Sequence, residues 1–139
     1  MTAEDFIRLA GNLAARPNAD PAVCRTAISR AYYGAYHVAR HILRQAGFDV
    51  SDHGQVRFCL FESGQPAGVE LARDLGLLQN VRIKADYELQ DADSESAVTT
   101  RLAVERAHRV ISNAALLTAA SVLPDVKTGV ATYLRKRGR

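Results

Sequence analysis

The chain has 139 residues, of which 47% are hydrophobic, and a net charge of +3, which is enough apolar material for one core and predicts one domain. No apolar run is long enough to span a membrane, and the first residues lack the basic start and apolar stretch of a signal peptide, so we expect a cytoplasmic protein without membrane contact. Cys24 and Cys59 are too few for a disulfide framework or a zinc site, and no metal or cofactor is expected.

Apolar residues recur with helical spacing along most of the sequence. Thr2 and Asp5 predict a capped start for the first helix, and Asp20 followed by Pro21 predicts the start of the second, which Gly47 ends. The segments with this pattern are residues 2–16, 20–47, 51–61, 67–89 and 94–122. No segment alternates as a strand does, so the sequence predicts an all-α, up-and-down bundle of four to five helices.

The last predicted helix ends before Pro124, because proline breaks a helix interior. We therefore divide the chain into a helical domain, residues 1–122, and a basic C-terminal tail, residues 123–139. Basic side chains in such a tail attract nucleic acid, but short solvated termini are commoner. Val126 and Val130 also allow a further helical turn or two, and the sequence leaves these alternatives open.

The second helix has a polar stripe opposite a face of small apolar residues. At 100° per residue the stripe contains Arg30, Tyr33, His37, Arg40, His41 and Arg44. One interpretation is a surface for phosphate or a nucleic-acid backbone, and the other is a solvated helix face. Tyr32 and Tyr36 fall outside the stripe and are predicted to pack in the core.

Arg82 lies on the apolar side of the fourth predicted helix, among leucines. A buried guanidinium needs a partner, and Asp86 lies one turn later on the same face. The pair either only fixes helix packing or belongs to an anion site completed by Asp86, Tyr87 or Lys84. We favour the anion site. His108, at the edge of the last helix's apolar face, is predicted to be a core residue.

Two segments, RAYYGAYH at residues 30–37 and VRIKADYEL at residues 81–89, resemble the HEPN family, in particular its small stand-alone prokaryotic members. The resemblance covers about residues 3 to 120. It implies a helical bundle, a homodimer with the arginine segments near the dimer seam, and a role in toxin-antitoxin or defence systems beside a nucleotidyltransferase-like antitoxin. In its ribonuclease members, an arginine followed after four to six residues by a histidine cleaves RNA at the dimer cleft.

The sequence departs from that ribonuclease pattern after Arg82. The three positions at the required spacing are Tyr87, Glu88 and Leu89, so the histidine that acts as general acid and base is absent. We therefore leave open whether the protein is an enzyme, with Arg82 and His37 as the candidate catalytic residues.

Our main hypothesis is binding of a nucleotide or RNA at a dimer cleft. The residues predicted to line it are Arg30, Tyr33, His37, Arg82, Asp86 and Tyr87. The first alternative is a metal-independent ribonuclease toxin in which His37 replaces the missing histidine. The second is a non-catalytic protein-interaction module that pairs with the nucleotidyltransferase-like partner.

Overall fold

The helices begin where the sequence supplies caps. The computed structural model describes residues 1–138, which contain six α-helices, one 3-10 helix and no strand. The α-helices are α1 (Ala3–Ala14), α2 (Pro21–Gln45), α3 (His53–Phe61), α4 (Pro66–Tyr87), α5 (Ala97–Leu117) and α6 (Leu123–Arg137), and the 3-10 helix is η1 (Ala92–Glu95). Thr2 and Asp5 form the predicted capping box, and the Asp20 side chain accepts a hydrogen bond from the Val23 main-chain N–H at 2.9 Å.

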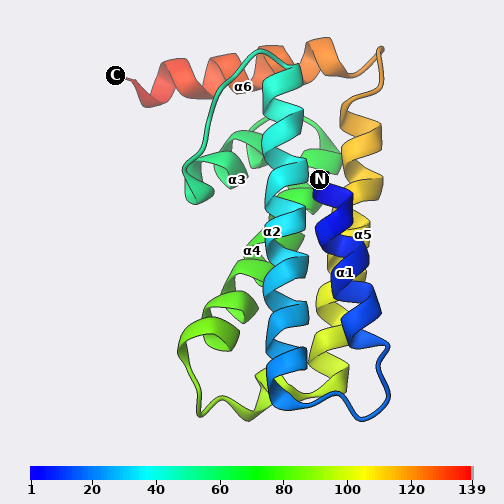
Figure 1. The fold of residues 1–139 in the computed structure, drawn as a ribbon. Coiled ribbons are helices and arrows are strands. Elements are labelled where there is room, and N and C mark those ends of the chain that lie inside the picture. Colours follow the sequence, from blue (N-terminus) through cyan, green and yellow to red (C-terminus); the bar gives the residue numbers. More distant parts are fainter. Residues whose placement is uncertain (139) are drawn as a thin grey trace.

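Four helices, α1, α2, α4 and α5, run along the long axis of the molecule, and α2 lies in contact with the other three (Figure 1). The α2 face toward its neighbours carries Ala27, Ala31, Ala35 and Ala39, all completely buried. These small side chains allow close helix packing. At Gly34 helix α1 comes close to α2, because an added Cβ would lie 2.5 Å from Ile7 Cγ1 and 3.0 Å from the main-chain oxygen of Ala3. The all-α class predicted from the sequence is confirmed.

The C-terminal segment differs from the predicted tail and extends the alternative of a further helical turn or two to a full helix. The helix expected to reach Val122 ends at Leu117, and residues 123–137, predicted as a tail, form α6, which crosses one end of the bundle (Figure 1). Pro124 lies in the first turn of α6, where proline is tolerated, so it starts a helix rather than only ending one. Val126 and Val130, one turn apart, are fully buried and hold α6 on the body. The predicted number of helices was therefore too low.

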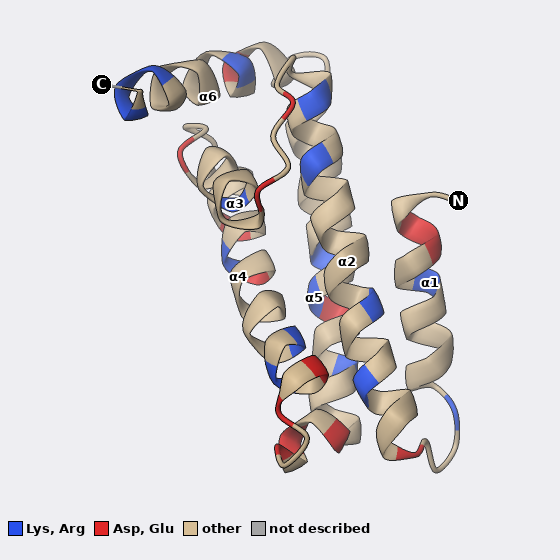
Figure 2. Ribbon diagram, turned by 60° about the vertical axis from the view of Figure 1, so that its left-hand side comes forward, with Lys and Arg blue, Asp and Glu red and all other residues tan. Residues whose placement is uncertain are grey.

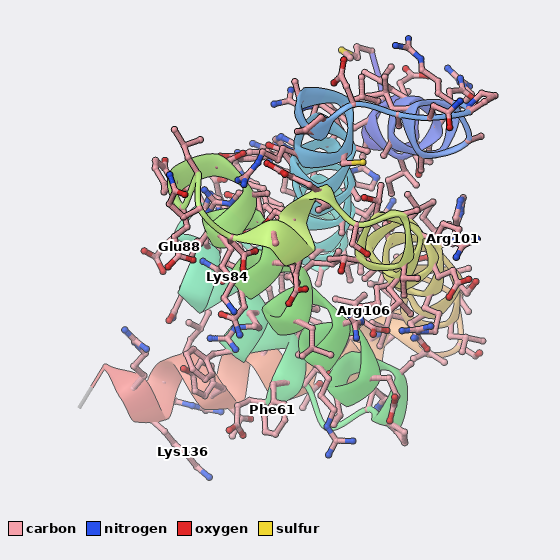
Figure 3. The ribbon with its side chains drawn as sticks, turned by 90° about the horizontal axis from the view of Figure 1, so that it is seen from below. Phe61, Lys84, Glu88, Arg101, Arg106 and Lys136 are labelled. Carbon is pink, nitrogen blue, oxygen red and sulfur yellow. The ribbon has the colours of Figure 1, made fainter. Side chains whose placement is uncertain are left out.

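The charged residues are distributed unevenly along the helices (Figure 2). Arginines follow α2 along much of its length, and Arg135, Lys136 and Arg137 make the last turn of α6 basic. Lys136 projects from the free end of α6, and Arg101 points away from the outer side of α5 (Figure 3). Within the described part of the chain, no helix combines the length and the apolar character that a membrane crossing requires.

Candidate anion-binding site between α2 and α4

Arg82 is buried between α4 and α2, as its position among the leucines predicts. Its exposed fraction is 8%, and its Cζ atom lies 5.0 Å from the centroid of the Tyr32 ring and 5.4 Å from that of Tyr33. Contacts of this kind between a guanidinium and aromatic faces are favourable. Asp86 Oδ2 is 3.7 Å from Arg82 Nη1 and also accepts a hydrogen bond from the Ser29 hydroxyl at 3.4 Å. The predicted Arg82–Asp86 pair is therefore present.

The pairing of Arg82 is incomplete. The 3.7 Å separation from Asp86 is longer than a hydrogen bond, and the buried Nε of Arg82 has no hydrogen-bond partner among residues 1–138. Buried charged donors usually have partners, because leaving one unpaired is costly. The Nη groups of Arg82 are not fully buried and donate no hydrogen bond within residues 1–138, so they, rather than the buried Nε, remain for another acceptor.

Tyr33 joins Arg82 to a second arginine. The Cζ atom of Arg30 lies 5.7 Å from the centroid of the Tyr33 ring and the same distance from that of Phe6. In the described structure Arg30 forms no ion pair, and its buried Nε has no hydrogen-bond partner. Two guanidinium groups thus flank one tyrosine, and Asp86 forms an ion pair with one of them, Arg82. The cluster has more positive than negative charge.

His53, the first residue of α3, also belongs to this cluster, although the sequence analysis did not select it. Its ring stacks on that of Tyr36, with centroids 4.1 Å apart and an interplanar angle of 17°, and meets the Tyr33 ring edge-on at 6.3 Å. Its Nδ1 is hydrogen-bonded to the Tyr32 hydroxyl. No spacing rule connects His53 with Arg82, because they lie on different helices and only tertiary packing brings them together.

The environment disfavours the charged forms of Tyr32 and His53. Burial raises the pKa of Tyr32 to about 12, so this hydroxyl keeps its proton near neutral pH. Burial, followed by the charge of Arg82, lowers the pKa of His53 below its ordinary value, while Asp52 opposes this shift. A neutral Tyr32 hydroxyl can therefore donate to Nδ1 of a neutral His53, which leaves the proton of the ring on Nε2.

The structure brings together four of the six residues predicted to line one cleft: Arg30, Tyr33, Arg82 and Asp86. His37 lies farther along α2, where it is exposed and stacks on Phe6 with ring centroids 5.9 Å apart. Tyr87 is 73% exposed and lies on a different side of α4 from Arg82.

Other sequence predictions about single side chains have mixed outcomes. Tyr32 and Tyr36 are buried, at 1% and 5% exposed, as predicted. His108 is exposed, so its predicted place in the core is wrong. The buried face of α5 passes through Ala107 and Val110, and His108 falls just outside it.

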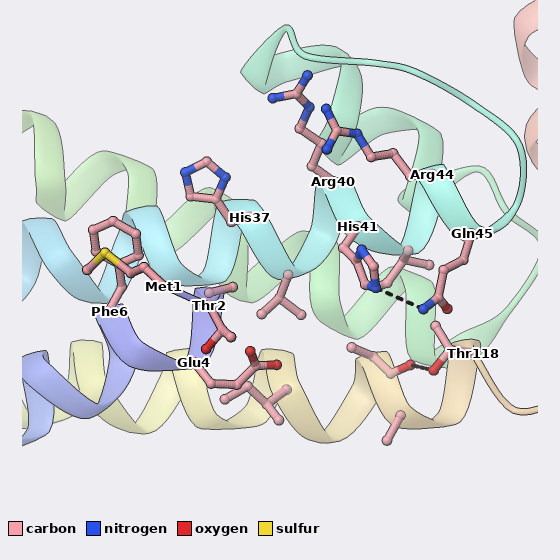
Figure 4. Close-up of a pocket in the computed structure, with 16 residues that line it drawn as sticks. Met1, Thr2, Glu4, Phe6, His37, Arg40, His41, Arg44, Gln45 and Thr118 are labelled. Carbon is pink, nitrogen blue, oxygen red and sulfur yellow. Dashed lines mark hydrogen bonds between the residues drawn. The ribbon is translucent and has the colours of Figure 1, made fainter.

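His37 lines a separate open groove of about 680 Å³ above the N-terminus of α1 (Figure 4). The groove exists because α1 begins partway along α2 and α5 and leaves the rest of their seam uncovered. Burial and the nearby charges of Arg40 and Arg44 lower the pKa of His37. Both arginines also lie near Asp49, at 3.5 and 3.8 Å, which offsets part of their charge.

Residues 1–138 contain no cluster of side chains that could bind a metal ion, and their two cysteines are not paired. In this range no group of three or more His, Cys, Asp or Glu side chains is placed to hold a metal ion. Cys24 and Cys59 are both buried free thiols. The candidate site consists instead of arginine, tyrosine and histidine side chains, which suit the binding of an anion or a stacked ring.

The fold and the site define an all-helical protein with a partly buried, basic and aromatic cluster between α2 and α4. A comparison with protein-family models, curated proteins and solved structures finds no significant match.

Proposed function

We propose that this protein is a HEPN-type module that binds a phosphate-bearing ligand, a nucleotide or RNA, at the cluster of Arg30, Tyr33, Arg82 and His53. The observation that carries the proposal is the incomplete pairing of Arg82 at 8% exposure. Guanidinium groups bind phosphate through paired N–H donors, and aromatic rings beside them stack on bases. The resemblance of residues 30–37 and 81–89 to HEPN segments supports the same location.

The competing interpretation is that the Arg82–Asp86 pair serves only to fix helix packing. A pair of that kind exists in this protein between α4 and α5, where Arg109 donates to both carboxylate oxygens of the buried Asp74 at 3.0 and 3.2 Å. The Arg82–Asp86 contact, at 3.7 Å, lacks this two-point geometry. The contrast favours a ligand-binding role for Arg82.

The test compares two arginines of α4. Arg82→Met keeps an apolar side chain between the tyrosines and removes the charge. Arg73→Met removes an exposed arginine from the other side of the helix, and within residues 1–138 this arginine pairs only with Glu70, at 3.6 Å. Fluorescence anisotropy with a labelled oligoribonucleotide, and competition with AMP, measure binding. We expect Arg82→Met to weaken binding at least about tenfold, as for loss of one charged contact, and Arg73→Met to change it little. Equal affinities for the wild type and Arg82→Met would refute the site.

The assembly follows from the resemblance. We propose a homodimer, which sedimentation equilibrium tests directly, and a nucleotidyltransferase-like antitoxin as the partner in a toxin-antitoxin or defence system. The open reading frame beside the gene tests the partner. A monomer at all concentrations, or a neighbour of unrelated chemistry, would contradict these two parts separately.

A second candidate function, metal-independent ribonuclease activity, is favoured by one observation. His53 supplies to the Arg82 cluster an imidazole that the sequence lacks at the usual spacing, whereas His37, the earlier candidate, lies outside the cluster. Cleavage of RNA in the presence of a chelator, lost in His53→Gln and retained in His37→Gln, is the expected result for this function. Absence of cleavage by the wild type would remove it and leave the binding function.

A further inference from the structure

We infer that His53 belongs to the Arg82 site. A phosphate-class oxyanion bound there accepts hydrogen bonds from Arg82 and from the protonated ring of His53 together. The inference rests on the proposed function and adds a residue and a proton to it. It predicts that binding takes up one proton, so that the affinity rises as the pH falls.

The geometry places the two groups around the same rings. The Tyr32 centroid is 5.0 Å from Arg82 Cζ and 5.6 Å from the His53 centroid, and Tyr33 contacts both groups as well. Nδ1 of His53 is hydrogen-bonded to the Tyr32 hydroxyl, while Nε2 has no hydrogen-bond partner within residues 1–138. Nε2 and the guanidinium of Arg82 are therefore two hydrogen-bond donors beside the same two tyrosines.

The groups that face His53 come from three segments. They are Tyr32, Tyr33, Tyr36 and His37 from α2, Asp52 before α3, and Arg82 with its partner Asp86 from α4. Arg82 opposes protonation of His53, and Asp52 favours it. Because Arg82 acts with burial against the charged form, the protein's own groups favour the neutral form of His53.

An oxyanion changes this balance. Its negative charge beside Arg82 cancels the repulsion that Arg82 exerts on a protonated His53, and the imidazolium then donates from Nε2 to an anion oxygen. The ring at Nδ1 keeps its contact with Tyr32, whose oxygen also accepts a hydrogen bond. By linkage, a ligand that raises the pKa of His53 binds more tightly as the pH falls from the pKa of the bound state to that of the free state. The affinity rises by up to about tenfold per pH unit in this range.

Sulfate is a suitable probe because it stays a dianion across the range in which histidine titrates. We propose to follow the His53 ring signals of the full chain by NMR from pH 5 to 8, with and without saturating sulfate, and to measure sulfate affinity at each pH. The expected result is a higher His53 pKa with sulfate and an affinity that increases toward low pH. An unchanged His53 pKa at saturation would overturn the inference, and this measurement needs no variant.

Variants separate the inference from the proposed function. His53→Gln should bind sulfate with an affinity that no longer depends on pH in this range, whereas the matched variants His41→Gln and His108→Gln, both at exposed positions, should keep the dependence. A pH dependence that persists in His53→Gln would overturn the inference. If sulfate binds through Arg82 without any pH dependence, the inference fails alone; if sulfate binding does not respond to Arg82→Met, the proposed site fails.

Two further probes distinguish the source of the phosphate. Methyl phosphate represents the terminal phosphate of a nucleotide, and a trinucleotide RNA without terminal phosphates represents the phosphodiester chain. A rise in the His53 pKa with one of them identifies which group the site accepts. No rise with either probe would contradict the inference for phosphate ligands.

Discussion

Arg25 of α2 caps the C-terminal end of α4 with its guanidinium group. The last carbonyls of a helix lack partners within the helix, and Arg25 supplies donors to several of them. Its acceptors are the main-chain oxygens of Lys84, Ala85, Glu88, Leu89 and Asp91 and the carboxylate of Glu95. The shortest of these contacts, to Ala85, is 2.9 Å, and the side chain is 11% exposed. Replacement of Arg25 by methionine keeps the apolar stem and removes all the donors.

The expected loss follows from the surroundings of the acceptors. The oxygens of Ala85 and Asp91 are partly buried, and each should lose about 1.5 kcal/mol when its charged donor disappears. The other acceptors are exposed and regain hydrogen bonds to water, so they add little. The sum is a decrease of about 3 kcal/mol in the free energy of unfolding. For 139 residues at about 2.1 cal/mol/K each, this lowers Tm by about 10 °C.

The assay is urea and thermal unfolding followed by circular dichroism. Arg25→Lys should lose less than Arg25→Met, because the ammonium retains charge and three donors but cannot reach so many oxygens at once. Arg101→Met, at an exposed position on the outer side of α5 (Figure 3), should change the stability by less than about 0.5 kcal/mol. A loss below about 1 kcal/mol in Arg25→Met would refute the reasoning.

Three further predictions concern other parts of the bundle. Arg109→Met leaves the carboxylate of Asp74 buried without its two-point partner, so urea unfolding should show a loss of about 2 kcal/mol, reduced from the value for a fully buried pair because Arg109 is half exposed. Gly129→Ala places a methyl group against the main chain of Ser63, so the α6 helix must shift, with an expected loss of about 2 kcal/mol in urea unfolding. Folding lowers the pKa of His53, so below about pH 6.5 the unfolded chain binds a proton that the native chain does not. The free energy of unfolding should therefore decrease as the pH falls from that value. His53→Gln should reduce this dependence in unfolding measured from pH 5 to 8.

Each of these predictions has a control. Asp74→Asn combined with Arg109→Met should recover part of the stability, because no buried charge then lacks a partner. Gly138→Ala, near the free end of α6, should have little effect, since an added Cβ there meets nothing closer than 3.5 Å. The exposed His108→Gln should leave the pH dependence of stability unchanged. A larger effect in any control than in its test variant would contradict the assigned contact.

The helical elements were predictable because their signals are local. Cap residues such as Thr2, Asp20 and Asp52 lie within three residues of the N–H groups they bind, so the sequence carries the complete interaction. The same local reasoning failed at Pro124, where a proline is compatible with the end of one helix and the start of the next. The burial of Val126 on the body decides between them, and burial depends on distant segments.

The sequence by itself determined that this protein is all-helical and that Arg82 lies on a buried helix face, because helical periodicity fixes the direction of each side chain relative to its neighbours one turn away. It also placed Arg30 and Tyr33 on one stripe of α2. Only the tertiary structure added His53 to Arg82 and separated Tyr87 and His37 from the cluster. The physical reason is that distances between helices depend on packing and on loop paths, which no spacing along a single helix records.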